Sequence, residues 1–342
     1  MRVRNPRKYI EFGIFGYLIL GFIDDSQVVP VLLKALKYRD WRVRYAAVRA
    51  LEIIGDVTAV PGLAETAIGD RDMRVRHFAM MALKEIGDSQ SIFALVKALR
   101  DCKGNTRRSA AKALEDIAFM EVFGRKVLAK IAGSPAVLDL IQALNDRVWE
   151  VRCAAARTLG RIGDPQSIPN LTQVLLEDPT RYVRAAAAGA LGDIGNSQAV
   201  PALLKALKDH RSEVVNSAIF ALGQIGSSRA VPELLKIFSA EDKEVKLRAS
   251  AVNALGKIGD PDAIPTLLRA LASDDYNMSV TVASALEQIS TKLQSIASCR
   301  QVIKALYRHY KRQIKFENLE NIANHLAVLE ADAETVTDPL LP

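Results

Sequence analysis

The sequence predicts an all-α protein, a right-handed α-α superhelix of about nine two-helix repeats with terminal capping helices. One reason is a motif that returns along the chain at a nearly constant spacing. A second is the length of 342 residues, which is more than a single hydrophobic core usually supports but suits an array that grows lengthwise. A third is the composition: aromatic residues make up 6%, so small helix-favouring side chains must fill the core.

The repeat is visible when the segment RVWEVRCAAARTLGRIGDPQSIPNL, from Arg147, is set against TRYVRAAAAGALGDIGNSQAVPALL, from Thr180. Equivalent residues of the two segments lie 32 positions apart, as Arg152 and Arg184 do. The same frame occurs upstream as VRYAAVRALEIIGD and VRHFAMMALKEIGD, and downstream around Gly226 and Gly259. A fixed period of this length indicates stacked supersecondary units.

Each unit is predicted to contain two helices. In the copy that begins at Val183, apolar residues recur in steps of three and four, which places them on one face of a helix. The glycine after the isoleucine is a helix stop, and a proline such as Pro201 opens the partner helix, where its missing N–H costs little. The alanines allow neighbouring helices to approach closely, so one pair can stack on the next.

These motifs resemble HEAT repeats of the short subclass named after phycobilisome lyases. The patterns VR-x-A-A-A-x-A-L-G-x-I-G-D and A-V-P-x-L-L-x-A-L carry the resemblance, from about Leu20 to Ile289. It implies a solenoid whose alanine-rich helices line a concave groove. It is specific for fold and weakly specific for function, because unrelated adaptors share the repeat.

Five segments are expected. They are N-terminal repeats over 1–117 with a degenerate first repeat, an irregular insertion over 118–134, further repeats over 135–290, capping helices over 291–330 and a disordered tail over 331–342. The insertion is inferred because Arg107 and Arg152 are 45 residues apart instead of 32. The apolar segment 10–23 resembles part of a signal peptide, but it aligns with the repeat frame and is too short to span a bilayer. No transmembrane segment is therefore expected, and the register begins midway through a unit.

One arginine recurs at a fixed repeat position, and an aspartate stands six residues before most copies. The arginines are Arg44, Arg76, Arg107, Arg152, Arg184 and Arg248, and the aspartates are Asp70, Asp101, Asp146, Asp178 and Asp242. A guanidinium group can bridge carboxylates and helix ends, so these residues predict a structural ladder between stacked units.

Composition narrows the function classes. The net charge of +7 permits acidic proteins, nucleic acid or an anionic membrane as partners without requiring any of them. Three scattered cysteines favour a reducing compartment, so a cytoplasmic location is expected. No phosphate loop, nucleophile motif or metal-ligand spacing is evident. Deoxyhypusine hydroxylase resembles this chain in repeat type but needs His-Glu pairs, and none of the four histidines precedes a glutamate. No metal and no catalytic residue are predicted.

The binding residues are expected on the groove side of the alanine-rich helices, at the second, fifth and sixth positions after each motif valine. They are Tyr45, Arg49, His77, Met80, Met81, Arg108, Lys112 and Arg157, followed by Asn216 and Phe220. Basic, aromatic and methionine side chains of this kind suit a partner with an acidic and apolar element. Because stacking does not use them, they are expected to be dispensable for folding.

The sequence thus favours a non-enzymatic scaffold that binds a protein partner and needs no cofactor. An alternative, implied by the resemblance, is a phycobilin lyase subunit or bilin chaperone, which would bind a linear tetrapyrrole such as phycocyanobilin. Nucleic-acid binding is a third and less favoured hypothesis. A basic C-terminal helix that includes Lys304 and Arg308 is expected to be a solvated face.

Overall fold

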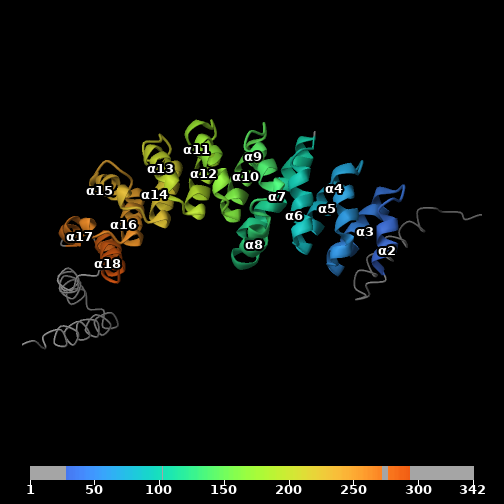
Figure 1. Ribbon diagram of the computed structural model, residues 1–342, viewed down its shortest axis with the longest axis horizontal. Coiled ribbons are helices and arrows are strands. Elements are labelled where there is room, and N and C mark those ends of the chain that lie inside the picture. Colours follow the sequence, from blue (N-terminus) through green and yellow to red (C-terminus); the bar gives the residue numbers. More distant parts are fainter. Residues whose placement is uncertain (1–27, 102, 272–275, 293–342) are drawn as a thin grey trace, which may run out of the picture. The chain divides into compact units, whose positions relative to one another are not determined.

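A computed structural model of the protein describes residues 28–101, 103–271 and 276–292. Every regular element in these ranges is a helix, and the predicted all-α solenoid class is confirmed (Figure 1). None of the described helices is long and apolar enough to cross a membrane. The helices occur in pairs, whose first member we call the A helix and whose second member we call the B helix.

The chain divides into two compact units, residues 1–194 and residues 195–342. The described pairs of unit 1 are α2 (Val29–Ala35) with α3 (Trp41–Ile54), α4 (Val60–Gly69) with α5 (Met73–Ile86), α6 (Ser89–Ala98) with α7 (Gly104–Phe119), α9 (Pro135–Ala143) with α10 (Trp149–Ile162), and α11 (Ile168–Glu177) with α12 (Arg181–Ile194). Its B helices contact one another in chain order, from α3 to α12.

The described pairs of unit 2 are α13 (Val200–Ala206) with α14 (Ser212–Ile225), α15 (Val231–Ser239) with α16 (Val245–Ile258), and α17 (Ile264–Leu271) with α18 (Tyr276–Ser290). Here too the B helices α14, α16 and α18 contact one another in order. The described ranges therefore hold eight pairs, against about nine expected from the repeat pattern. The predicted capping helices, the basic helix with Lys304 and Arg308, the tail and the apolar segment 10–23 lie outside the described residues.

The helix ends follow from local sequence. Asp40 caps α3 by accepting a 2.9 Å hydrogen bond from the backbone N–H of Arg42. Gly55 ends the same helix with φ of 68°, a left-handed conformation that glycine adopts without a steric penalty. Most A helices follow a short 3-10 turn and have a proline in their first turn, as in α11, which follows η4 (Pro165–Ser167).

Small residues bring the B helices together as the sequence predicts. A Cβ atom placed on Gly160 of α10 would lie 2.6 Å from the Cα of Ala190 in α12. In unit 2 a Cβ on Gly223 would lie 2.9 Å from the Cα of Ala254. The neighbouring backbones therefore occupy the space that any side chain at these glycines would need.

The repeated arginines form a ladder in unit 1, with a geometry more specific than the sequence suggested. Arg152 donates through Nε and Nη2 to the Asp178 carboxylate at 2.6 and 3.0 Å, and through Nη1 to the backbone carbonyl of Asp146 at 2.8 Å. The aspartate six residues earlier thus supplies a carbonyl, and the aspartate of the following pair supplies the carboxylate. Arg44 with Asp70, and Arg107 with Asp146, repeat this rung.

The ladder is not uniform. Arg76 is buried and donates to the carbonyls of Asp70 and Arg71, but its Nε has no hydrogen-bond partner in the described part of the molecule. In unit 2, Arg248 donates to the carbonyl of Phe238 at 2.9 Å. Among the described residues, the arginine–aspartate rungs whose two members lie in the same unit are all found in unit 1.

The stretch 118–134, for which the sequence predicts an irregular insertion, contains helical residues. It holds the end of α7, then α8 (Glu121–Leu128) and the 3-10 turn η3 (Ala129–Ile131). Val127, Leu128 and Ile131 are buried, and α8 contacts α6, α7 and α10. The added residues therefore extend the core locally.

Candidate partner-binding surface

One set of exposed and half-buried side chains on the unit 1 B helices forms a surface that we call the B-face. Because α3, α5, α7, α10 and α12 contact one another in order, equivalent positions of these helices lie next to each other. The B-face comprises Tyr45, Arg49, Glu52, His77, Phe78, Met81, Lys84, Glu85, Arg108, Ser109, Lys112, Glu115, Asp116, Phe119, Arg157, Arg161 and Asp193.

Most of the binding residues predicted in unit 1 lie on this surface. Arg108 and Lys112 are exposed, and a half-buried group comprises Tyr45, Arg49, His77, Met81 and Arg157. Phe220 is exposed and Asn216 is half-buried on α14 in unit 2.

Met80 is the exception among the predicted residues, because it is fully buried. It stands five positions after its motif valine, as Val48 does, and Val48 is also buried. That position is turned about 140° around the helix axis from the valine. Met80 is therefore a core residue, and the expectation that it meets a partner is corrected.

An aromatic cluster occupies the first two B helices. The Tyr45 and Phe78 rings meet edge to face with centroids 4.9 Å apart, and Trp41 approaches Tyr45 at 6.5 Å. The Arg49 guanidinium lies 5.4 Å from the Phe78 centroid. Phe78 and Trp41 were not among the predicted binding residues, because they fall just outside the three positions considered.

Carboxylates pair with the basic side chains of the B-face, which the sequence-based prediction did not include. Arg49 contacts Glu52 at 2.6 Å, Arg108 contacts Glu150 at 3.4 Å and Lys112 contacts Asp116 at 2.8 Å. Arg157 of α10 pairs with Glu115 of α7 and lies over the Phe119 ring. The B-face is therefore a mixed network of charges rather than a purely basic surface.

Within most of these pairs the cation is the more exposed partner. The exposed fractions are 35% for Arg49 and 15% for Glu52, and 40% for Arg157 and 17% for Glu115. Lys112 is 59% exposed above Asp116 at 27%. Lys84 and Glu85 show the opposite order, with 12% and 47%. An approaching molecule thus meets guanidinium and ammonium groups first at most positions, with carboxylates beneath them.

Burial also affects the acid–base properties of this layer. Desolvation raises the pKa of Glu52 above its ordinary value, although the charge of Arg49 acts in the opposite direction. Burial raises the thiol pKa of Cys153 on α10 to about 11, so this cysteine stays protonated near neutral pH. Within the described residues, no group of three or more His, Cys, Asp or Glu side chains is placed to hold a metal ion.

The pairing changes one expectation about folding. Arg49 and Arg157 were predicted to be dispensable for the fold, but each contacts both a carboxylate and an aromatic ring. Replacing either arginine by glutamate would set two carboxylates against each other in a partly buried site. Neutral replacements of the more exposed Arg108 and Lys112 are better probes of binding.

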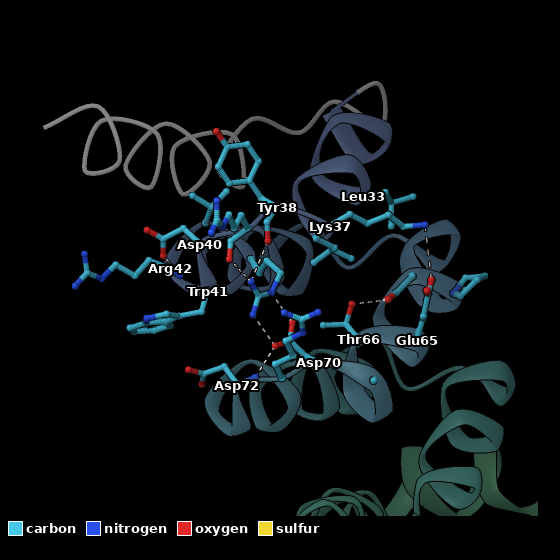
Figure 2. Close-up of a pocket in the computed structure, with 18 of the residues that line it drawn as sticks. Leu33, Lys37, Tyr38, Asp40, Trp41, Arg42, Glu65, Thr66, Asp70 and Asp72 are labelled. Carbon is cyan, nitrogen blue, oxygen red and sulfur yellow. Dashed lines mark hydrogen bonds and ion pairs between the residues drawn. The ribbon is translucent and has the colours of Figure 1, made fainter. Parts of the chain in front are cut away.

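A second feature of unit 1 is an open groove between its first two pairs, which we call the first groove (Figure 2). It is lined by α2 and α4, by the loops that follow them and by the first turn of α3. Leu33, Leu36, Pro61 and Gly62 supply apolar surface, and Lys37 approaches Glu65 at 4.0 Å. The Arg44–Asp70 rung forms part of the groove wall.

Comparisons with known proteins agree with this architecture. A family model for HEAT repeats matches residues 17–72, 125–191, 168–249 and 232–312, and a model for the PBS lyase HEAT-like repeat matches residues 75–101. No curated protein sequence matches the chain.

Several solved structures are similar. An engineered protein is 22% identical with a TM-score of 0.55, and the match covers 94% of this chain and 96% of that one. The Escherichia coli protein YibA is 21% identical with a TM-score of 0.50, covering 84% and 98%. The CpcE–CpcF complex of phycocyanin lyase from a Nostoc species is 23% identical with a TM-score of 0.41, covering 72% and 93%.

Proposed function

Because the chain belongs to the HEAT-repeat family, we propose that it is a non-enzymatic scaffold that binds a protein partner along the B-face of unit 1. Repeat solenoids offer an extended surface whose exposed positions vary while the packing frame stays constant. The B-face has this character, since its side chains come from successive helices and stand outside the core.

The observation that carries the proposal is the layered charge of the B-face. Carboxylates beneath hold Arg49, Lys112 and Arg157 in place while leaving the cations more exposed. Cations held in advance lose less side-chain entropy when they meet a carboxylate of a partner. An acidic protein segment is therefore the favoured ligand.

The apolar element of the partner has a matching surface nearby. Tyr45, Phe78 and Met81 are half-buried on the first two B helices, and Phe119 is exposed at the end of α7. Aromatic and methionine side chains dominate many interface cores, because they bury much area with adaptable shape. We therefore expect an acidic segment that carries at least one large apolar side chain.

Site-specific photocrosslinking tests where the partner lies. A photoreactive amino acid at Lys112 on α7 should crosslink a defined protein in the source cells. The same residue at Lys97, which is exposed on α6 in the same helix pair, is the matched control and should not capture that protein. Equal capture from both positions, or none from Lys112, would refute the B-face assignment.

The charge component can then be measured with the captured partner. Arg108→Gln with Lys112→Gln should weaken binding by at least about tenfold, which corresponds to about 1.4 kcal/mol. Lys97→Gln with Arg147→Gln makes the same change of net charge at exposed positions outside the B-face and should leave the affinity unchanged. An equal loss in both double variants would show that only overall charge matters.

Adding phycocyanobilin tests the alternative ligand, and a spectral shift that the B-face variant abolishes would favour a bilin over a protein.

A further inference from the structure

We propose that Trp149 and Tyr182, on the first turns of α10 and α12, form an aromatic ledge that binds a proline-rich segment of a partner protein in the polyproline II conformation. Both helices belong to unit 1, and both residues lie in the described part of the chain. The ledge is separate from the B-face. The inference does not depend on the acidic partner proposed for that surface, and it adds a second class of ligand.

The two rings of the ledge form one exposed surface. Trp149 is 40% exposed and Tyr182 is 46% exposed, although tryptophan is on average a highly buried residue. The ring centroids are 5.5 Å apart, and the ring planes are tilted by 33°. Arg181 Nη2 donates a 2.7 Å hydrogen bond to the Tyr182 hydroxyl, which restrains the phenol ring. The aromatic surface is therefore organised before a ligand arrives.

The equivalent tryptophan of the first pair is covered. Trp41 and Trp149 each begin a B helix, three residues before the ladder arginine. Trp41 is half-buried, and the guanidinium carbon of Arg74 lies 3.6 Å from its ring centroid. Arg74 and Tyr182 occupy the same repeat position in the helix that follows each tryptophan. An internal cation thus covers the first tryptophan, whereas an exposed phenol extends the surface of the second.

The polar groups of the ledge are hydrogen-bond donors. Within the described residues, the indole N–H of Trp149 makes no hydrogen bond. The Tyr182 hydroxyl accepts from Arg181 and keeps its own O–H to donate. The neighbouring charges are paired, since Glu150 faces Arg108 at 3.4 Å and Arg181 contacts the phenol. The ledge therefore offers apolar rings and neutral donors, which favours an uncharged ligand that is rich in acceptors.

A proline-rich segment has this chemistry. Proline has no backbone N–H, and the polyproline II conformation leaves the backbone carbonyls without internal partners. The pyrrolidine rings pack on aromatic side chains, and the preformed conformation loses little entropy on binding. A polyproline II helix repeats about every 9 Å, close to the distance of about 8–10 Å between the axes of packed helices. Successive turns of one ligand can therefore contact α10 and α12.

The test uses tryptophan fluorescence, because the chain contains two tryptophans. In full-length Trp41→Phe protein, an uncharged proline decapeptide should shift the Trp149 emission to shorter wavelength in a saturable way. Full-length Trp149→Phe protein, which keeps Trp41, should show no shift. In the Trp41→Phe background, Tyr182→Ala should weaken binding by at least about tenfold, as expected for an aromatic anchor. Phe93→Ala removes a similarly exposed aromatic ring from α6, and this matched control should leave the affinity unchanged.

Two further probes test the class of ligand. An uncharged Leu-Ser decapeptide reports whether any apolar chain binds, and a thymidine decanucleotide reports whether the ledge stacks bases. Both should bind more weakly than the proline peptide, and equal or tighter binding of either would overturn the proposal. A Trp149 emission that does not respond to the proline peptide would also overturn it, and so would equal losses in Tyr182→Ala and Phe93→Ala.

One more variant separates this site from the B-face. Lys112→Gln should leave the titration with the proline peptide unchanged, and a loss of binding there would place the ligand on the B-face instead. Crosslinking from Lys112 uses a different probe and reports on the acidic partner. The two proposals can therefore fail independently.

Discussion

The B helices of the two units share one repeat frame but present different chemistry. In unit 1 they carry ion pairs such as Arg49–Glu52 and Arg157–Glu115 beside an aromatic cluster. In unit 2 the equivalent surface of α14 and α16 is largely uncharged. There Ser250 donates a 2.7 Å hydrogen bond to Asn216, and Lys257 lies over the exposed Phe220 ring. The contrast teaches that the frame fixes which positions are exposed and leaves their chemistry free to vary.

The pairs are also joined differently. Unit 1 has carboxylate rungs between successive pairs, and unit 2, within its described residues, has the single-carbonyl contact of Arg248. Both units use close glycine–alanine packing between B helices. The carboxylate rungs are therefore an addition to a packing scheme that also works with other contacts.

Removing a rung should give the largest effect. Arg152→Ala leaves the Asp178 carboxylate half-buried without its bidentate partner, and we expect a loss of about 3 kcal/mol. Hydrogen exchange should accelerate mainly in α10, α11 and α12, because repeat stability depends on nearest neighbours. Arg248→Ala in unit 2 removes one carbonyl contact and should cost only about 1 kcal/mol. Equal losses of stability in Arg152→Ala and Arg248→Ala would show that the carboxylate rungs of unit 1 stabilise no more than the carbonyl contact of unit 2. Arg147→Ala, at an exposed loop position, is the neutral control.

Substitutions of glycine should give smaller effects of opposite sign. Gly223→Ala places a methyl group 2.9 Å from the Ala254 Cα, and we expect a destabilisation of about 1–2 kcal/mol. Gly189→Ala, in the middle of α12, meets nothing within 4 Å and should stabilise the helix by about 0.5–1 kcal/mol. Thermal unfolding of the two variants measures both changes in stability. A destabilised Gly189→Ala variant would show that the open position is more crowded than its geometry indicates.

The smallest effect concerns the titration of the unit 1 charges. The Glu52 carboxyl should have a pKa above the ordinary value of a glutamate, because desolvation by burial outweighs the opposing charge of Arg49. A raised folded-state pKa means that this group destabilises the fold above that pKa, and the cost disappears as the pH falls towards the unfolded value. Arg49→Met should raise the Glu52 pKa further. Carbon-detected NMR titration measures the Glu52 pKa in both proteins. Asp72, with a pKa of about 2, is the reference whose pKa should not change.

The sequence predicted the fold well because the frame residues have strong local preferences. Gly55 and its equivalents must end helices, Asp40 must cap one, and the spacing of arginines marks the ladder. The charge pairing on the surface was harder to foresee. The partner of Arg49 lies one turn along its own helix, so i to i+3 spacing could have revealed it. The partner of Arg157 is 42 residues away, across the insertion, and only the folded register brings Glu115 to it.

One rung has a practical implication. Arg107 and Asp146 are 39 residues apart, whereas Arg44 and Asp70 are 26 apart, yet both pairs close with the same bidentate contact. The surplus is taken up by α8 and η3 while the attachment points on either side keep their spacing. This junction therefore accommodates inserted residues while the helix pairs on both sides keep their stacking. A protein engineer could exchange its contents, or graft a reporter domain there, without resetting the repeats on either side.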